Sequence, residues 1–353
     1  MHKLNKTIIN MKEVDFMNKK GNVVGLLSGV TWAIYTVILY TVLNLYANSK
    51  GDLLSVKGII LILITTILIS LADLFFNVIF ELFVVKRSNL MEEFKSVFFS
   101  KKGFGIIPAA ILAGPLGLIP YAIASAISAP VAGAFSALYP VIGAIASFLV
   151  FKERLSKLKA IGGLISVIGV MLTYQLESVS LVVYIIALIP AFGWGLEAIF
   201  GYRLIKDDVN PIVTITIRHI YSIAILAICL VLFLGFSGEY TYVMEFYGGI
   251  QFSEVFAILN NSFVWIVFAI GSFIGATSYI LWYVSMKYIS VAPAMILNIS
   301  YVLWIPIILT LPPFSQKISP NVLLGCVVVF LGTSMVIIGD NIKLKRQERL
   351  TEM

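Results

Sequence analysis

The sequence predicts an all-α integral membrane protein whose ten transmembrane helices form two inverted five-helix repeats. Of the 353 residues, 60% are hydrophobic and 12% are charged, and the mean hydropathy is +1.00; soluble domains contain about 25% charged residues. Apolar runs of about twenty residues, the length that a helix needs to cross a bilayer, recur along the chain. The two halves also resemble each other when the sequence is shifted against itself.

Ten apolar runs define the expected spans. They cover residues 22–45, 58–84, 104–126, 129–151, 158–175, 181–203, 211–236, 263–287, 290–312 and 320–340. The first run follows five lysines and has no small-residue cleavage site, so we expect a retained membrane helix rather than a signal peptide. An even number of spans places both termini on the same side.

The lysines and arginines predict the orientation. With the N-terminus inside, 21 of the 25 Lys and Arg residues lie in inside segments and 3 in outside segments, and cytoplasmic loops retain basic residues. We therefore expect a plasma-membrane protein with cytoplasmic tails at 1–20 and 341–353. The net charge of +7 is explained by this bias and does not predict nucleic-acid binding. The longest outside loop, 237–262, contains three glutamates and no basic residue.

Internal similarity predicts the repeats. A shift of 163 residues places the fourth and fifth spans on the ninth and tenth, and a shift of 162 aligns two tryptophans. The matched pairs are Ala129-Pro130 with Ala292-Pro293, Gly162 with Gly325, Gly169 with Gly332, and Trp32 with Trp194. Five spans per repeat is an odd number, so the second repeat, 177–340, would be inverted relative to the first, 21–176, as in many secondary transporters. We expect the glycines to pack spans five and ten together.

Aromatic and polar residues recur at the depth where such transporters bind their substrates. Counting about 1.5 Å per residue from the span ends puts them near the bilayer centre. Because Trp and Tyr are usually enriched at the interfaces instead, the set indicates a pocket. The predicted substrate-binding residues are Trp32, Tyr35, Trp194, Glu197, Tyr279, Tyr283, Asn298 and Tyr301.

Ionisable residues within spans are candidates for function because charge is expensive in lipid. Glu197 and Arg218 are expected at matching depth, either as a structural ion pair or with Glu197 as counter-charge to a cationic substrate. Asp73 is deep enough to carry a proton, whereas Glu81 is expected near the interface and solvated. We expect no cofactor or metal, and no enzyme activity, because acids, bases and metal ligands do not cluster.

The chemistry of this pocket favours a particular substrate class. Indole and phenol faces attract a quaternary ammonium group through cation–π interactions, so we expect choline or a betaine as the small cationic partner.

Several stretches resemble known transporters. The segment from Ala129-Pro130 to Phe151-Lys152-Glu153-Arg154-Leu155, followed by Gly162 and Gly169, resembles the EamA-like repeat of the drug/metabolite transporter superfamily, although the second half has Gln316 where the first has Glu153. Closer likeness is to LicB-type choline importers, carried by Gly193-Trp194-Gly195-Leu196-Glu197 and Leu297-Asn298-Ile299-Ser300-Tyr301-Val302-Leu303-Trp304. This resemblance implies proton-linked choline uptake, with Trp32, Trp194, Glu197, Tyr279, Asn298 and Tyr301 at the site.

Other functions remain open on the sequence alone. An exporter of amino acids, metabolites or drugs would have the same fold, because sequence does not set the direction of transport. A binding-only receptor would not require inverted repeats. The expected partners are the cation, the proton and the lipid bilayer, in a monomer or a homodimer.

Overall fold

The computed structural model describes residues 2–47, 56–174, 180–236, 262–312 and 314–352, and these residues form helices and no strands. The helices are α1 (His2–Ala47), α2 (Val56–Arg87), α3 (Met91–Phe98), α4 (Lys101–Phe104), α5 (Ile107–Ala113), the π-helix η1 (Gly114–Leu118), α6 (Ile119–Ser136), α7 (Tyr139–Phe151), α8 (Lys157–Thr173), α9 (Leu181–Lys206), α10 (Pro211–Phe236), α13 (Ser262–Ile289), α14 (Val291–Asn298), α15 (Tyr301–Thr310) and α16 (Pro320–Glu352).

Nine helical segments within the described residues are long and apolar enough to cross a membrane. They are Val14–Ile38, Ile67–Arg87, Lys101–Ser125, Val131–Phe151, Leu181–Lys206, Pro211–Leu232, Trp265–Ile289, Val291–Thr310 and Pro320–Gly339. Large apolar side chains such as Phe75, Leu149 and Phe330 are more than half exposed, as expected for surfaces that face lipid rather than water. The chain therefore has the architecture of an all-α, multi-pass membrane protein.

The fifth expected span, 158–175, forms the shorter helix α8 of 17 residues, which packs along α16. A Cβ atom on Gly162 would lie 2.6 Å from the carbonyl oxygen of Gly332, and one on Gly169 would lie 2.9 Å from that of Gly325. Such distances leave no room for a side chain, so these glycines bring the two backbones into contact. The expected glycine packing between these segments is confirmed.

Two expected spans are interrupted where the sequence predicts continuous helices. In the fourth span, 129–151, the link Ala137–Leu138 separates α6 from α7. The extended residue Ser128 (φ −153°, ψ 99°) lies within α6 but before this span, between the third and fourth expected spans. In the ninth span, Ile299–Ser300 separates α14 from α15. The third span is assembled from α4, α5, the π-helical η1 and the start of α6.

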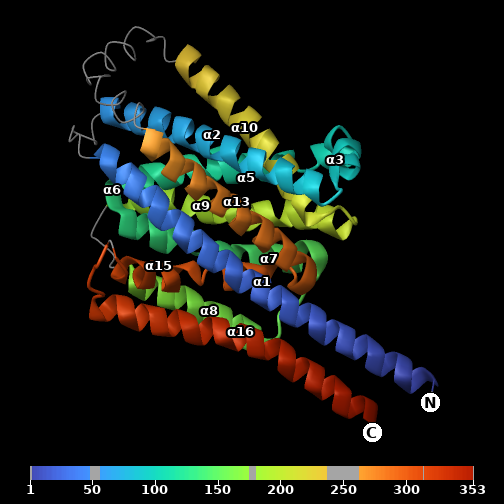
Figure 1. Ribbon diagram of the computed structural model, residues 1–353. Coiled ribbons are helices and arrows are strands. Elements are labelled where there is room, and N and C mark those ends of the chain that lie inside the picture. Colours follow the sequence, from blue (N-terminus) through green and yellow to red (C-terminus); the bar gives the residue numbers. More distant parts are fainter. Residues whose placement is uncertain (1, 48–55, 175–179, 237–261, 313, 353) are drawn as a thin grey trace.

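The two ends of the chain lie at the same end of the helix bundle, together with α3 (Figure 1). The expected tails 1–20 and 341–353 continue the membrane helices, since α1 begins at His2 and α16 ends at Glu352. The expected joint between the repeats and the acidic loop 237–262 lie largely outside the described residues, which exclude 175–179 and 237–261.

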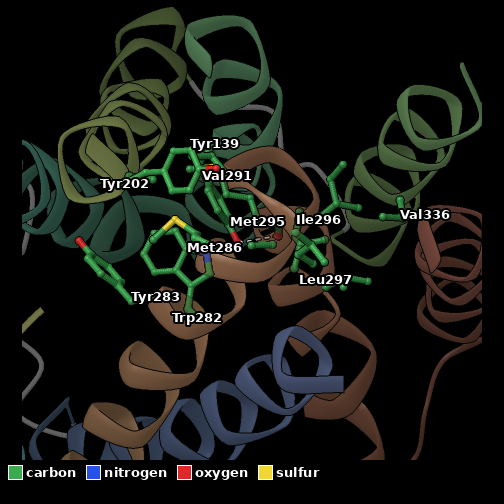
Figure 2. Packing of buried hydrophobic residues seen from close by; sticks show 14 of the residues in the cluster. Tyr139, Tyr202, Trp282, Tyr283, Met286, Val291, Met295, Ile296, Leu297 and Val336 are labelled. Atoms are coloured by element: carbon green, nitrogen blue, oxygen red, sulfur yellow. Dashed lines mark hydrogen bonds between the residues drawn. The ribbon is translucent and has the colours of Figure 1, made fainter. Parts of the chain in front are cut away.

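The hydrophobic core surrounds α14, in which every residue from Val291 to Leu297 is buried. Figure 2 shows Trp282, Met286 and Met295 gathered next to Tyr139. Methionine fills irregular gaps well, which suits a core where short helices meet. This core supports one wall of the cavity described next.

Candidate functional site

A cavity of about 390 Å³ lies where the helices converge, a size within the range of small-molecule sites, about 300–1,000 Å³. Its lining comes from α1, α2, α5, η1, α6, α7, α9, α10, α13, α14 and α15, so both halves of the chain contribute. Of the ten residues predicted for binding, coupling or charge pairing, nine line it, and Tyr283 does not. Tyr283 is fully buried behind the wall and donates a hydrogen bond to Glu197 Oε1 at 3.2 Å.

One side of the cavity is an aromatic corner between α1 and α13. The ring centroid of Trp32 lies 5.1 Å from that of Tyr35 and 5.2 Å from that of Tyr279, with the Tyr279 ring nearly perpendicular at 83°. Trp282 lies 6.4 Å from Tyr279 and also lines the cavity. The edge-to-face arrangement of Trp32 and Tyr279 is one that aromatic pairs prefer, and the rings of this corner border the same space.

A second aromatic group lies on α6 and α9. Trp194 contacts Tyr121, with ring centroids 5.3 Å apart. A Cβ atom on Gly117 would lie 2.5 Å from the indole Nε1 of Trp194, so glycine in η1 makes room for that ring. Tyr301 lines the cavity as predicted.

Three tyrosines of the lining were not among the predicted site residues: Tyr121, Tyr139 and Tyr174. Tyr121 and Tyr174 lie near the ends of expected spans, and Tyr139 begins α7. A depth count assigns residues near span ends to the interfaces, so it could not find Tyr121 and Tyr174. Tyr139 lies near the middle of the expected span 129–151, so its depth was an available signal.

Glu197 and Arg218 form a buried ion pair. Arg218 Nε lies 2.8 Å from Glu197 Oε1, and the two side chains are only 3% and 1% exposed. The guanidinium also lies over the Tyr279 ring, 5.2 Å from its centroid. The ion pair is present and both of its residues line the cavity, and the role of Glu197 as counter-charge to a cation stays a prediction.

Asp73 lines the cavity from α2 and is less buried than the ion pair. Its Oδ2 accepts hydrogen bonds from the Tyr35 hydroxyl at 3.0 Å and from Asn77 Nδ2 at 3.3 Å. No salt bridge joins Asp73 to a cation within the described residues. Asp73 is therefore a cavity carboxylate that has hydrogen-bond donors but no positive partner there.

Asn298 holds two interrupted helices together. Its Oδ1 accepts from the Tyr139 hydroxyl at 2.8 Å, and its Nδ2 donates to Ser28 Oγ at 3.0 Å. The amide thus links α14 to α7 and to α1, directly beside both helix interruptions. Asn298 lines the cavity as predicted, but its hydrogen-bonding groups are engaged by the protein.

The expectation that Glu81 is solvated is wrong. Glu81 is completely buried, and its Oε1 lies 2.7 Å from Nδ1 of His219, which is also completely buried. Helix α10 covers this part of α2, a contact that a depth count along α2 alone cannot reveal. The presence of two ionisable residues within apolar spans was the available signal, because such residues usually pair.

Three ionisable groups other than tyrosine therefore line the cavity: Asp73, Glu197 and Arg218. With all three charged, the wall carries one more negative than positive charge. An enclosed space with this excess, bordered by indole and phenol rings, attracts an organic cation through both charge and ring faces.

No protein-family model and no curated protein matches the chain. A solved structure described as "Crystal structure of protein" is similar to it, with a TM-score of 0.61 and 15% sequence identity, over 90% of this chain and 96% of that chain. The likeness shows a shared fold over nearly all of both chains.

Proposed function

We propose that the chain is a secondary transporter that imports choline or a related quaternary amine across the plasma membrane together with protons. The observation that carries the proposal is the aromatic cavity with two carboxylates and one guanidinium. A quaternary ammonium group cannot donate hydrogen bonds, so it gains more from aromatic faces and a nearby carboxylate than from amides or hydroxyls. The corner of Trp32, Tyr35 and Tyr279 beside Asp73 offers both.

The glycine contacts support an inverted repeat. Gly162 contacts Gly332, and Gly169 contacts Gly325, whereas the sequence shift matches Gly162 with Gly325 and Gly169 with Gly332. Gly162 therefore contacts the glycine that matches Gly169, and Gly169 contacts the glycine that matches Gly162. Reciprocal contacts of this kind arise across a two-fold axis. A pseudo-two-fold axis between α8 and α16 fits ten spans, with α8 as the fifth.

The helix interruptions support the same arrangement. Adding 163 residues to the interruption Ala137–Leu138 gives 300–301, within one residue of the interruption Ile299–Ser300. Interrupted helices at corresponding positions of two inverted repeats are typical of transporter binding sites. We propose that the halves 21–176 and 177–340 rock about the cavity in alternating access, as the resemblance to the drug/metabolite transporter superfamily and its LicB-type members implies.

The distribution of basic residues supports cytoplasmic termini. Both ends of the chain and α3 lie at one end of the bundle (Figure 1), and the segment 85–103 between the second and third expected spans, which includes α3, has five of the basic residues. A proton gradient directed inward would then drive accumulation of the cation.

Transport is tested by uptake of labelled choline into proteoliposomes with an acidic exterior. We expect saturable uptake in the wild type and a strong loss in Trp194→Ala, with Trp265→Ala as a matched control, because Trp265 does not line the cavity. Absence of saturable uptake, or full activity in Trp194→Ala, would contradict the proposal.

A thermal-shift series separates the substrate classes. Choline and betaine should stabilise the purified protein, whereas amino acids and nucleotide sugars should not. Stabilisation by amino acids alone would favour the exporter of amino acids or other metabolites.

A further inference from the structure

The most deeply buried ionisable pair of the described residues lies outside the cavity. Glu81 on α2 and His219 on α10 are both 0% exposed, and their nearest atoms lie 2.7 Å apart. A buried ionisable pair within membrane spans is costly to keep and is a candidate for function. No group of three or more possible metal ligands exists among the described residues, so the pair is not part of such a cluster.

The pair adjoins the cavity through one ring. The His219 ring lies 4.7 Å from the Tyr279 ring, which lines the cavity and contacts Trp32. The neighbouring residue on α10 is Arg218, which lines the cavity and pairs with Glu197. A cation stacked on Trp32 and Tyr279 would therefore lie one aromatic ring away from His219.

The hydrogen bonding of the pair is incomplete. Oε2 of Glu81, Nε2 of His219 and Oδ1 of Asn77 have no partner within the described structure. Asn77 and Glu81 are four residues apart on α2, so they are neighbours on one face. A proton on Glu81 Oε2 would turn that oxygen from an acceptor into a donor, whereas the role of His219 Nε2 depends on the tautomer of the ring. A buried polar atom without a partner is costly.

The charges around the pair favour binding of one proton and one cation together. The charged or titratable groups that surround it are Asp73 on α2, Arg218 with its partner Glu197, and Tyr279 from α13. If Asp73 and Glu197 are ionised and Glu81 and His219 share one proton, the net charge of these groups is minus one. One bound organic cation makes it zero, whereas loss of the proton would leave an uncompensated charge within the bilayer.

We propose that the Glu81–His219 pair is the binding site of the coupling proton, and that Asp73 is the counter-charge of the transported cation. The inference rests on the proposed function, because it assigns the proton of the same transport cycle. In the loaded state one proton is shared between Glu81 Oε1 and His219 Nδ1 or resides on Glu81 Oε2. It is released to water at the side where the loaded protein opens, and a new proton binds at the other side.

Two transport assays on the full-length protein in proteoliposomes separate coupling from binding. Choline accumulation driven by a pH gradient requires proton binding, whereas exchange of internal for external choline requires only the cation site. We expect Glu81→Gln to lose accumulation and to keep exchange, and Asp73→Asn to lose both. The control Glu92→Gln, at an exposed position on α3, should keep both activities.

The assignment would be overturned if Glu81→Gln kept accumulation and only Asp73→Asn lost it. Retained exchange also shows that Glu81→Gln is folded. If that variant does not fold, His219→Gln, which keeps a hydrogen-bond donor, is tested in the same two assays with the same expectation.

An infrared titration without substrate tests the assignment even if the wild type transports no choline. We expect the band of a protonated carboxyl group in the wild type to disappear in Glu81→Gln and to remain in Asp73→Asn. A band that disappears only in Asp73→Asn contradicts the assignment. Absence of wild-type choline exchange would overturn the proposed function instead, so the two failures are distinguishable.

Discussion

Replacement of Arg218 by Met tests the buried ion pair, and the structure gives the expected magnitude. The charged atoms of Arg218 and Glu197 are 2.8 Å apart, which corresponds to about 6 kcal/mol of attraction at an effective dielectric constant of about 20. Part of this attraction offsets the free-energy cost of burying both charges. Removing one partner of such a pair lowers the free energy of unfolding by about 3–5 kcal/mol, because the other charge stays buried alone.

The assay is denaturant unfolding of the purified protein in micelles, arranged as a double-mutant cycle. We expect Arg218→Met alone to be strongly destabilising and Glu197→Gln/Arg218→Met to recover most of the loss. Lys206→Ala is the matched control: Lys206 Nζ lies 3.0 Å from Glu153 Oε1, but the side chains are 43% and 25% exposed, so the loss should be less than about 1 kcal/mol. Additive single effects in the Arg218–Glu197 cycle would refute the reasoning.

Three further changes have defined outcomes. Trp32→Ala should weaken choline binding about 5–30-fold in a calorimetric titration, from the loss of about 1–2 kcal/mol of cation–π attraction, with Trp32→Phe largely unchanged; equal binding by both variants would contradict the aromatic site. Asp73→Asn should weaken choline binding more than it weakens binding of a neutral isostere in the same titration, and equal losses would exclude a charge effect. Gly169→Ala should lower the unfolding free energy by about 1–3 kcal/mol, because its Cβ would lie 2.6 Å from the Val329 backbone nitrogen; Gly114→Ala, where the nearest atom would be 3.7 Å away, should lower it less, and equal losses would contradict the packing argument.

The sequence predicts the membrane architecture well because hydropathy and glycine spacing are local signals. Apolar runs locate the spans since lipid demands about twenty apolar residues. The glycines of α8 and α16 are recognisable because their spacing places them on one helix face. The interruption at Ala137–Leu138 has a local signal in Pro140, which lacks a backbone N–H and lies in the first turn of α7. No proline follows Ile299–Ser300 as closely, so hydropathy and glycine spacing cannot show that second interruption.

Counting depth along single helices explains both the correct and the incorrect predictions for the cavity and its surroundings. Depth counting finds Trp32, Trp194 and Tyr279 because their helices are continuous through the bilayer centre. It wrongly predicts that Glu81 is solvated, because a count along α2 takes no account of His219 on the covering helix α10. The packing of one helix against another is a property of the tertiary structure. It cannot be predicted when each span of the sequence is considered separately.

The most direct test of choline transport is counterflow into proteoliposomes that contain the purified protein and are preloaded with unlabelled choline. This measurement needs a binding site and alternating access but no ion gradient. We expect saturable entry of labelled choline, stimulated by internal choline and inhibited by other quaternary amines. Entry no faster than into protein-free vesicles, with no choline bound by the purified protein, would contradict it.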